Sequence, residues 1–204
     1  MLGAGVLHQI GKRVFLPSSY TGCRRNVIQN YHDGIAIYRV YGPLDLFITF
    51  TCNPKGLEIT LAILQGEQPN DRPDIIVRVF HMKLQQLLED IRSGAIFGPI
   101  VAILYSIELQ KRGLPHVHIL LWLDKNGYEI TPEIVDKWIS AEIPDPREDP
   151  LGYVLIAEHM LHGPCGDKNK NCPCMKKGKC SKYYPKEFQN ETTFTDKGFT
   201  QYRH

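Results

Sequence analysis

The chain alternates between segments with the apolar periodicity of helices and segments with that of strands. Residues 20–41 place apolar side chains three or four positions apart and stop at Gly42, which predicts a helix. Residues 70–94 open with Asn, Asp and Pro, repeat the same spacing and stop at Gly94, so they predict a second, longer helix. Shorter helices are expected at residues 55–65, 131–140 and 151–161.

Three other segments have strand patterns. In residues 44–53, apolar and polar side chains alternate before Pro54, which predicts a strand with one apolar and one polar face. Residues 100–110 and 116–123 are apolar runs joined by the turn-like sequence KRGLP, which predicts a β-hairpin. Helices between strands, and neighbouring strands in a hairpin, indicate an α+β fold with a largely antiparallel sheet.

Length and composition add few constraints. The 204 residues are 43% hydrophobic and 23% charged, which is typical of one globular domain with at most a small appendage. The longest apolar runs are far shorter than the roughly 20 residues that span a bilayer, so no membrane partner is expected. The N-terminal residues lack the basic lead-in and the cleavage site of a secretory signal, so secretion is not expected either.

Charge and cysteine are concentrated near the C-terminus. The formal net charge is only +2, but residues 165–186 contain seven lysines against the single acid Asp167. Four of the six cysteines fall in the same window. Without a secretory signal, such a cluster indicates metal binding before it indicates disulfides.

The most informative chemistry lies in the predicted hairpin. His116 and His118 are two residues apart on a strand, so both side chains leave the same face. If the hairpin pairs residue 108 with 118 or, one step over, with 116, Glu108 joins that face at about 4.5–5.5 Å between opposed Cβ atoms. Two imidazoles and one carboxylate leave coordination positions open, as in catalytic metal sites. His-x-His also occurs in strands that bind no metal. The spacing alone does not identify the reaction, so a metal hydrolase or an oxygenase remains an alternative function.

The segment ELQKRGLPHVHILLWL resembles the histidine–hydrophobic–histidine (HUH) motif of rolling-circle replication initiators, in the form found in Helitron transposases. Other segments agree in the same order: LPSSYTG, DLFITFTCNP, DRPDIIVRVFHMKLQQLLEDI, FGPIVA, AEIPDPREDP, HMLHGPCG and CPCMKKGKCSKYYPKEF. From about residue 16 onward the chain therefore resembles the Helitron-like N-terminal domain. The resemblance implies an HUH/Rep-like fold, with a five-stranded antiparallel sheet flanked by helices and a Cys/Lys-rich irregular lobe at the C-terminal end.

The resemblance also implies site residues and a reaction. Glu108, His116 and His118 would bind Mg²⁺ or Mn²⁺ and support single-strand DNA cleavage by a tyrosine, which leaves a 5′-phosphotyrosine. The resemblance implies that residues 49–54, at the end of the strand that begins at residue 44, correspond to the family's first motif, which lies beside the site in such folds. The residues implied to contact DNA or support the site around these motifs are Thr49, Thr51, Asn53, Lys111 and Arg112. The alternative for the strand residues is that polar side chains on a half-exposed face simply meet solvent.

The chain departs from the family pattern at the nucleophile. The family places its tyrosine on a helix after the cysteine segment and a helicase domain later, whereas Tyr183 and Tyr184 lie within the cysteine segment itself. We therefore assign no catalytic tyrosine, and the chain has no phosphate-binding loop of an ATPase. We expect an HUH/Rep-like core at residues 1–148, and at residues 149–204 a helix and lobe truncated before the tyrosine motif.

The cysteine segment offers a possible zinc site. A plausible tetrahedral set is His162, Cys165, Cys174 and Cys180, with Cys172 as a substitute. The alternative is reduced cysteines in a lysine-rich loop with no metal. The lysines expected to contact DNA phosphates, rather than to form only a solvated charge run, are Lys176, Lys177, Lys179 and Lys182.

Three functions follow from these patterns. The first is a metal-dependent single-strand DNA nicking and strand-transfer domain, acting with single-stranded DNA and a downstream helicase domain of the full-length polypeptide. The second is a DNA-binding remnant without chemistry, and the third is the metal hydrolase or oxygenase. For the first two, the expected location is intracellular and nuclear.

Overall fold

The computed structural model describes residues 14–110, 113–125, 127, 129–196 and 199–203, and it divides into two compact units. The first unit ends at Asp124 and the second begins at Lys125. Within the second unit, Asp136 on α4 (Pro132–Trp138) accepts a hydrogen bond from Thr192 and pairs with Arg203. The functional division into a catalytic core and a lobe stays a prediction.

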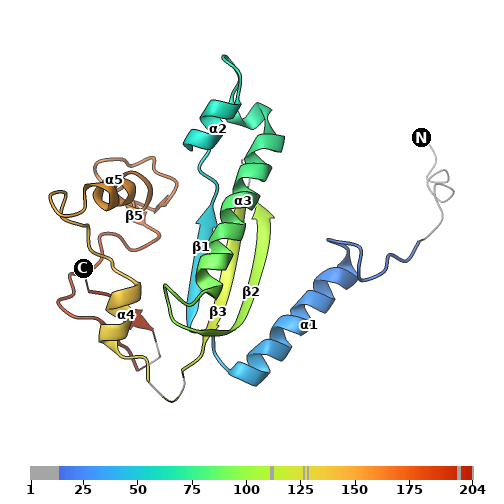
Figure 1. Cartoon of the computed structure of the whole chain (residues 1–204). Helices are drawn as coiled ribbons and strands as arrows, with labels where there is room; N and C mark the ends of the chain where they lie inside the picture. Colours follow the sequence, from blue (N-terminus) through green and yellow to red (C-terminus); the bar gives the residue numbers. More distant parts are fainter. Residues whose placement is uncertain (1–13, 111–112, 126, 128, 197–198, 204) are drawn as a thin grey trace, which may run out of the picture. The chain divides into compact units, whose positions relative to one another are not determined.

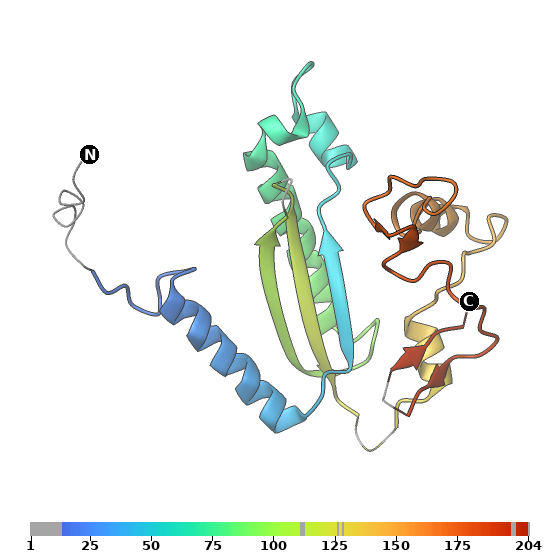
Figure 2. The ribbon, with the colours of Figure 1, turned by 180° about the vertical axis from the view of Figure 1, so that it is seen from behind.

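The first unit contains a three-stranded antiparallel sheet (Figures 1 and 2). Its order is β1 (Leu46–Thr51), β3 (Pro115–Leu123), β2 (Ile100–Leu109), so β3 is the central strand. The mixed helix-and-strand class and the antiparallel pairing are confirmed. The five-stranded sheet that the resemblance implies is not formed in the described residues, because helix precedes β1 and the chain after β3 enters the second unit.

Helix α3 (Pro73–Arg92) crosses one face of this sheet (Figure 1). Its inward side chains recur every three or four residues, as the periodicity predicts; they are Ile76, Phe80, Leu84, Leu88 and Ile91. The alternate residues Val117, Ile119 and Leu121 of β3 are fully buried on the same side, and the Phe80 ring stacks on Phe50 of β1 at 5.4 Å between centroids. This core occupies one face of the sheet and leaves the intervening residues of β3 on the other.

Two further helices complete the first unit. Helix α2 (Leu57–Ala62) follows β1 and buries Ile59, and a short 3₁₀ turn, η2 (Pro69–Asp71), precedes α3. Helix α1 (Arg24–Tyr41) forms where the periodicity predicts it, but none of its residues is buried in the described structure. No helix in the described residues is both long and apolar enough to cross a membrane.

The second unit is mostly irregular. After α4 come α5 (Pro150–His159) and two short hairpins, β4 (Met175–Lys176) with β5 (Lys179–Cys180), and β6 (Thr193–Phe194) with β7 (Thr200–Gln201). Lys177 and Gly178 join β4 to β5 with φ of 51° and 75°, the left-handed values that tight two-residue hairpin turns require.

Candidate metal centres

The strand register brings Glu108, His116 and His118 to one face of the sheet. Glu108 lies directly opposite His116 across the β2–β3 pair, which decides between the two registers that the sequence left open. Because side chains alternate along β3, both histidines point away from the face that α3 covers. Thr51 of β1 lies opposite His116 from the other side, so the polar faces of three strands meet here.

Glu108, His116 and His118 form the first cluster, and their ligand-type atoms lie within 4.8 Å of one another. Glu108 Oε1 is 3.2 Å from His118 Nε2, and the Thr51 hydroxyl is 2.7 Å from His116 Nδ1. The two imidazole rings meet edge to face, with their centroids 4.6 Å apart.

This donor set fits a divalent cation. Two nitrogen or oxygen ligands, each about 2.1 Å from a shared ion, lie about 3.0–3.4 Å apart for angles between a right and a tetrahedral angle. The 3.2 Å between Glu108 and His118 falls in that range. In the described residues, His118 Nδ1 is buried without a hydrogen-bond partner, an arrangement that costs stability unless another group satisfies the nitrogen.

The site is buried around His116 and open to solvent at Glu108 and, in part, at His118, whose side chain is 36% exposed. His116 is only 8% exposed, and the Phe47 ring stacks on His118 at 5.5 Å. The Glu108 side chain is 58% exposed, so a ligand in solution could approach beside it.

The other residues expected near this site have different roles. Thr51 contacts His116, which agrees with a site-supporting part, whereas Thr49 is exposed opposite His118. The Asn53 side chain accepts a hydrogen bond from the Lys55 amide at 3.0 Å, so in this structure it stabilises the turn before α2. Lys111 and Arg112 lie outside the described residues.

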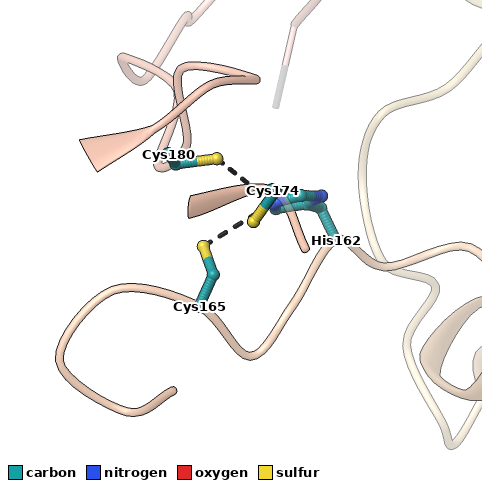
Figure 3. Close-up of side chains that lie close together, drawn as sticks. All are labelled: His162, Cys165, Cys174 and Cys180. Atoms are coloured by element: carbon teal, nitrogen blue, oxygen red, sulfur yellow. Dashed lines mark hydrogen bonds between the residues drawn. The ribbon is translucent and has the colours of Figure 1, made fainter. Parts of the chain in front are cut away.

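A second cluster lies in the second unit (Figure 3). The side chains of His162, Cys165, Cys174 and Cys180 converge with their ligand atoms within 4.8 Å of one another. His162 Nε2 is 3.3 Å from Cys180 Sγ and 3.6 Å from Cys165 Sγ. A zinc ion about 2.3 Å from sulfur and about 2.0 Å from nitrogen, at tetrahedral angles, would separate these atoms by about 3.5 Å. The geometry therefore fits tetrahedral zinc.

The other ligand candidates are outside this cluster. Cys172 Sγ lies 3.4 Å from Cys174 Sγ but is not one of the four converging residues. All six cysteines are described and none forms a disulfide. The structure thus brings together the first-choice set rather than the one with Cys172 substituted, although its metal binding stays a prediction.

Two thiols of the cluster have opposite pKa shifts. Burial raises the pKa of Cys174 to about 12, and hydrogen bonds with neighbouring thiols add to the effect. Burial also acts against ionisation of Cys180, but hydrogen bonds from the Tyr184 and Lys182 amides and from Cys174 and His162 outweigh it and lower its pKa to about 6. Cys180 is therefore the thiol most readily present as the thiolate, which is the form that binds metal.

The lysines predicted to contact DNA flank this cluster. Lys176 and Lys179 face each other across the β4–β5 pair, Lys177 occupies its turn, and Lys182 follows it. All four are exposed, so they are available to phosphates.

The fold and the first cluster define a mixed α/β domain with two histidines and a carboxylate on the open face of an antiparallel sheet. The chain belongs to the family described as the Helitron helicase-like domain at the N-terminus, whose model matches residues 3–121. The match includes Glu108, His116 and His118, whereas the cysteine cluster lies beyond it. No curated protein matches the chain. Family membership points to a Helitron-type element, and so to a helicase context and to nucleic acid as the partner.

Proposed function

We propose that this chain is the metal-dependent single-strand DNA nicking and strand-transfer domain of a Helitron-type rolling-circle transposase. The observation that carries the proposal is the convergence of Glu108, His116 and His118 in a chain that belongs to this family. Because none of its tyrosines is assigned as the nucleophile, other segments of the element's polypeptide supply the tyrosine and the helicase. Its partner is single-stranded DNA, and its site of action is the nucleus.

Each residue of the first cluster has a distinct part in this proposal. His116 and His118 supply two neutral nitrogen ligands, and Glu108 supplies a negative one that remains open to solvent. Thr51 holds His116 through Nδ1 and leaves Nε2 available as the ligand. When bound, Mg²⁺ or Mn²⁺ polarises the scissile phosphate and neutralises charge on the transition state. Imidazole ligands favour Mn²⁺ over Mg²⁺, which prefers oxygen.

The second cluster has a structural part. His162, Cys165, Cys174 and Cys180 would close a four-ligand zinc site, with no position left for substrate. Zinc would stabilise a segment that is too polar to fold by apolar burial alone.

Metal titration tests the proposal. Wild type should bind one Mn²⁺ at the first cluster, and the His116→Ala/His118→Ala variant should lose this binding in electron paramagnetic resonance or calorimetry. The matched control is His32→Ala/His81→Ala, which removes two exposed histidines of the same unit and should leave binding unchanged. Equal Mn²⁺ binding by wild type and the His116/His118 variant would remove the site.

A second candidate, a DNA-binding module without chemistry, is favoured by the exposed lysines of the second unit and the absence of an assigned tyrosine. A labelled single-stranded oligonucleotide with Mn²⁺, offered to the chain together with the tyrosine-bearing segment of the element's polypeptide, separates the two. Nicking that disappears in the His116/His118 variant supports the nuclease. DNA retention by that variant, with no nicking by wild type, supports the binding module.

A further inference from the structure

The chain around Cys180 presents two adjacent tyrosines in opposite ways. The Tyr184 ring stacks on the His162 imidazole, with 4.1 Å between centroids and 15° between planes. Tyr183 instead is 81% exposed and has a φ of 58°, a left-handed conformation that is uncommon outside glycine. One tyrosine is therefore packed against the second cluster while the other is presented to solvent.

The turn that presents Tyr183 is fixed by the cluster itself. The Tyr183 amide donates to the Cys180 carbonyl at 3.0 Å, and the Lys182 amide donates to the Cys180 sulfur at 3.4 Å. Because the Cys180 sulfur also contacts His162, the Tyr183 backbone is anchored to a residue of the cluster. An exposed ring on an anchored backbone loses little conformational entropy when it binds a ligand.

The charge around this ring is strongly positive. Lys186 Nζ lies 5.8 Å from the Tyr183 ring centroid and 5.4 Å from that of Tyr184. Four exposed lysines precede the ring in the chain: Lys176, Lys177, Lys179 and Lys182. Glu187 is the one acidic residue between residues 175 and 188.

We propose that Tyr183 is a base-stacking residue and that residues 176–186 form a binding surface for single-stranded DNA. This inference rests on the proposed function only for the choice of DNA as the ligand. A flat exposed ring among cations matches an unpaired nucleotide, whose base offers a π-face and whose phosphate offers a negative charge. In a duplex the bases are already stacked on one another, so the ring would have no free face to contact.

Fluorescence anisotropy with a labelled 15-nucleotide oligo-dT and the whole chain tests the stacking role. Since stacking of one base on an aromatic ring contributes about 1–3 kcal/mol, Tyr183→Ala should weaken binding at least about 5-fold. Tyr183→Phe keeps the ring and should bind like wild type. The control Phe199→Ala removes a ring that is 70% exposed elsewhere in the second unit and should have no effect.

The outcomes separate this inference from its alternatives. Unchanged binding by Tyr183→Ala would overturn it, as would a loss with Tyr183→Phe equal to that with Tyr183→Ala. Binding of duplex DNA as tightly as oligo-dT would also overturn it. Binding of oligo-U, a single-stranded RNA, is measured in the same way. If the chain bound oligo-U as tightly as oligo-dT, the assignment of DNA as the ligand would be overturned.

The lysines are tested by salt. Each phosphate contact to a single strand adds about 0.7 to the slope of log Kd against log salt concentration, so Lys176→Ala/Lys179→Ala should lower that slope by about 1.4. An unchanged slope would exclude these lysines from the surface. The oligo-dT measurements are made without added Mg²⁺ or Mn²⁺, so they do not depend on an ion at the first cluster. A failure of the nicking proposal would therefore leave the Tyr183 result interpretable.

Discussion

The hydroxyl of Thr51 forms a hydrogen bond with Nδ1 of His116, at 2.7 Å. A neutral imidazole has one protonated nitrogen, and a metal ligand must present the other. When Nδ1 carries the proton and donates the hydrogen bond to Thr51, Nε2 is the nitrogen left to bind a metal, and the ring itself is buried. The residue opposite His116 on the neighbouring strand would thus act on a bound metal through that histidine.

Thr51→Val should therefore weaken Mn²⁺ binding about 10-fold, because loss of an outer hydrogen bond to a ligating histidine typically costs 10- to 100-fold in affinity. The change preserves side-chain shape, and Thr51→Ser, which restores the hydroxyl, should recover the affinity. Isothermal titration calorimetry provides the measurement. An affinity unchanged by Thr51→Val would show that the hydrogen bond does not position His116.

A second residue-scale prediction concerns the start of α3. Arg72 donates two hydrogen bonds to Asp74, at 3.0 and 2.9 Å, and they are the main cause of the lowered pKa of this carboxyl. A lowered folded-state pKa stabilises the fold above the unfolded value of 3.8, and this stabilisation is lost as the pH falls through the folded-state pKa. Asp74→Asn should thus lower the urea midpoint at pH 7. The difference from wild type should vanish near pH 2, and a constant difference would contradict the ion pair.

At the scale of elements, α3 provides much of the described core of the first unit. Leu84 is fully buried between the helix and the sheet, so Leu84→Ala should lower the free energy of unfolding by about 2–5 kcal/mol. Met82, on the same helix, is 66% exposed, and Met82→Ala should change it by less than about 0.5 kcal/mol. Urea denaturation followed by circular dichroism compares the two, and similar losses would contradict the orientation of α3.

The elements themselves were largely predictable, because they depend on local periodicity and on breakers such as Gly42 and Gly94. The order of the strands could not be predicted, because the pairing of β1 with β3 joins segments more than sixty residues apart. The contact between Thr51 and His116 is an example. Helix α1 forms where its apolar spacing predicts a helix. Periodicity predicts which side chains share a face of a helix, but not whether that face finds a partner, and in the described structure α1 buries none.

At the scale of the whole molecule, the two candidate metal centres belong to different compact units. The four-residue cluster could be predicted as a set because its members lie within nineteen residues of one another, although only the folded chain excludes Cys172 from it. The sequence could not decide which histidine lies opposite Glu108, because it allowed two registers of the hairpin. The folded hairpin pairs Glu108 with His116.

Zinc removal should therefore affect one unit alone. In zinc-loaded protein the cluster thiols, Cys165, Cys174 and Cys180, should resist alkylation by iodoacetamide, and a chelator should expose them. Cys52, in the first unit, is 6% exposed and burial raises its pKa, so it should stay protected in both states. Mass spectrometry of the modified peptides reads out each thiol. Equal labelling of the cluster with and without zinc would contradict a metal site there.

Because β3 is the central strand, the residues of the first cluster are not held equally firmly by the sheet. The strand that carries both imidazoles is hydrogen-bonded along both flanks, whereas Glu108 extends from a strand with one unpaired edge in the described sheet. Glu108 therefore lies on a strand that backbone pairing restrains on one side, and the two histidines lie on a strand restrained on both sides. Glu108, His116 and His118 would hold a divalent ion here, and Glu108 would be the ligand whose strand is least restrained by backbone pairing.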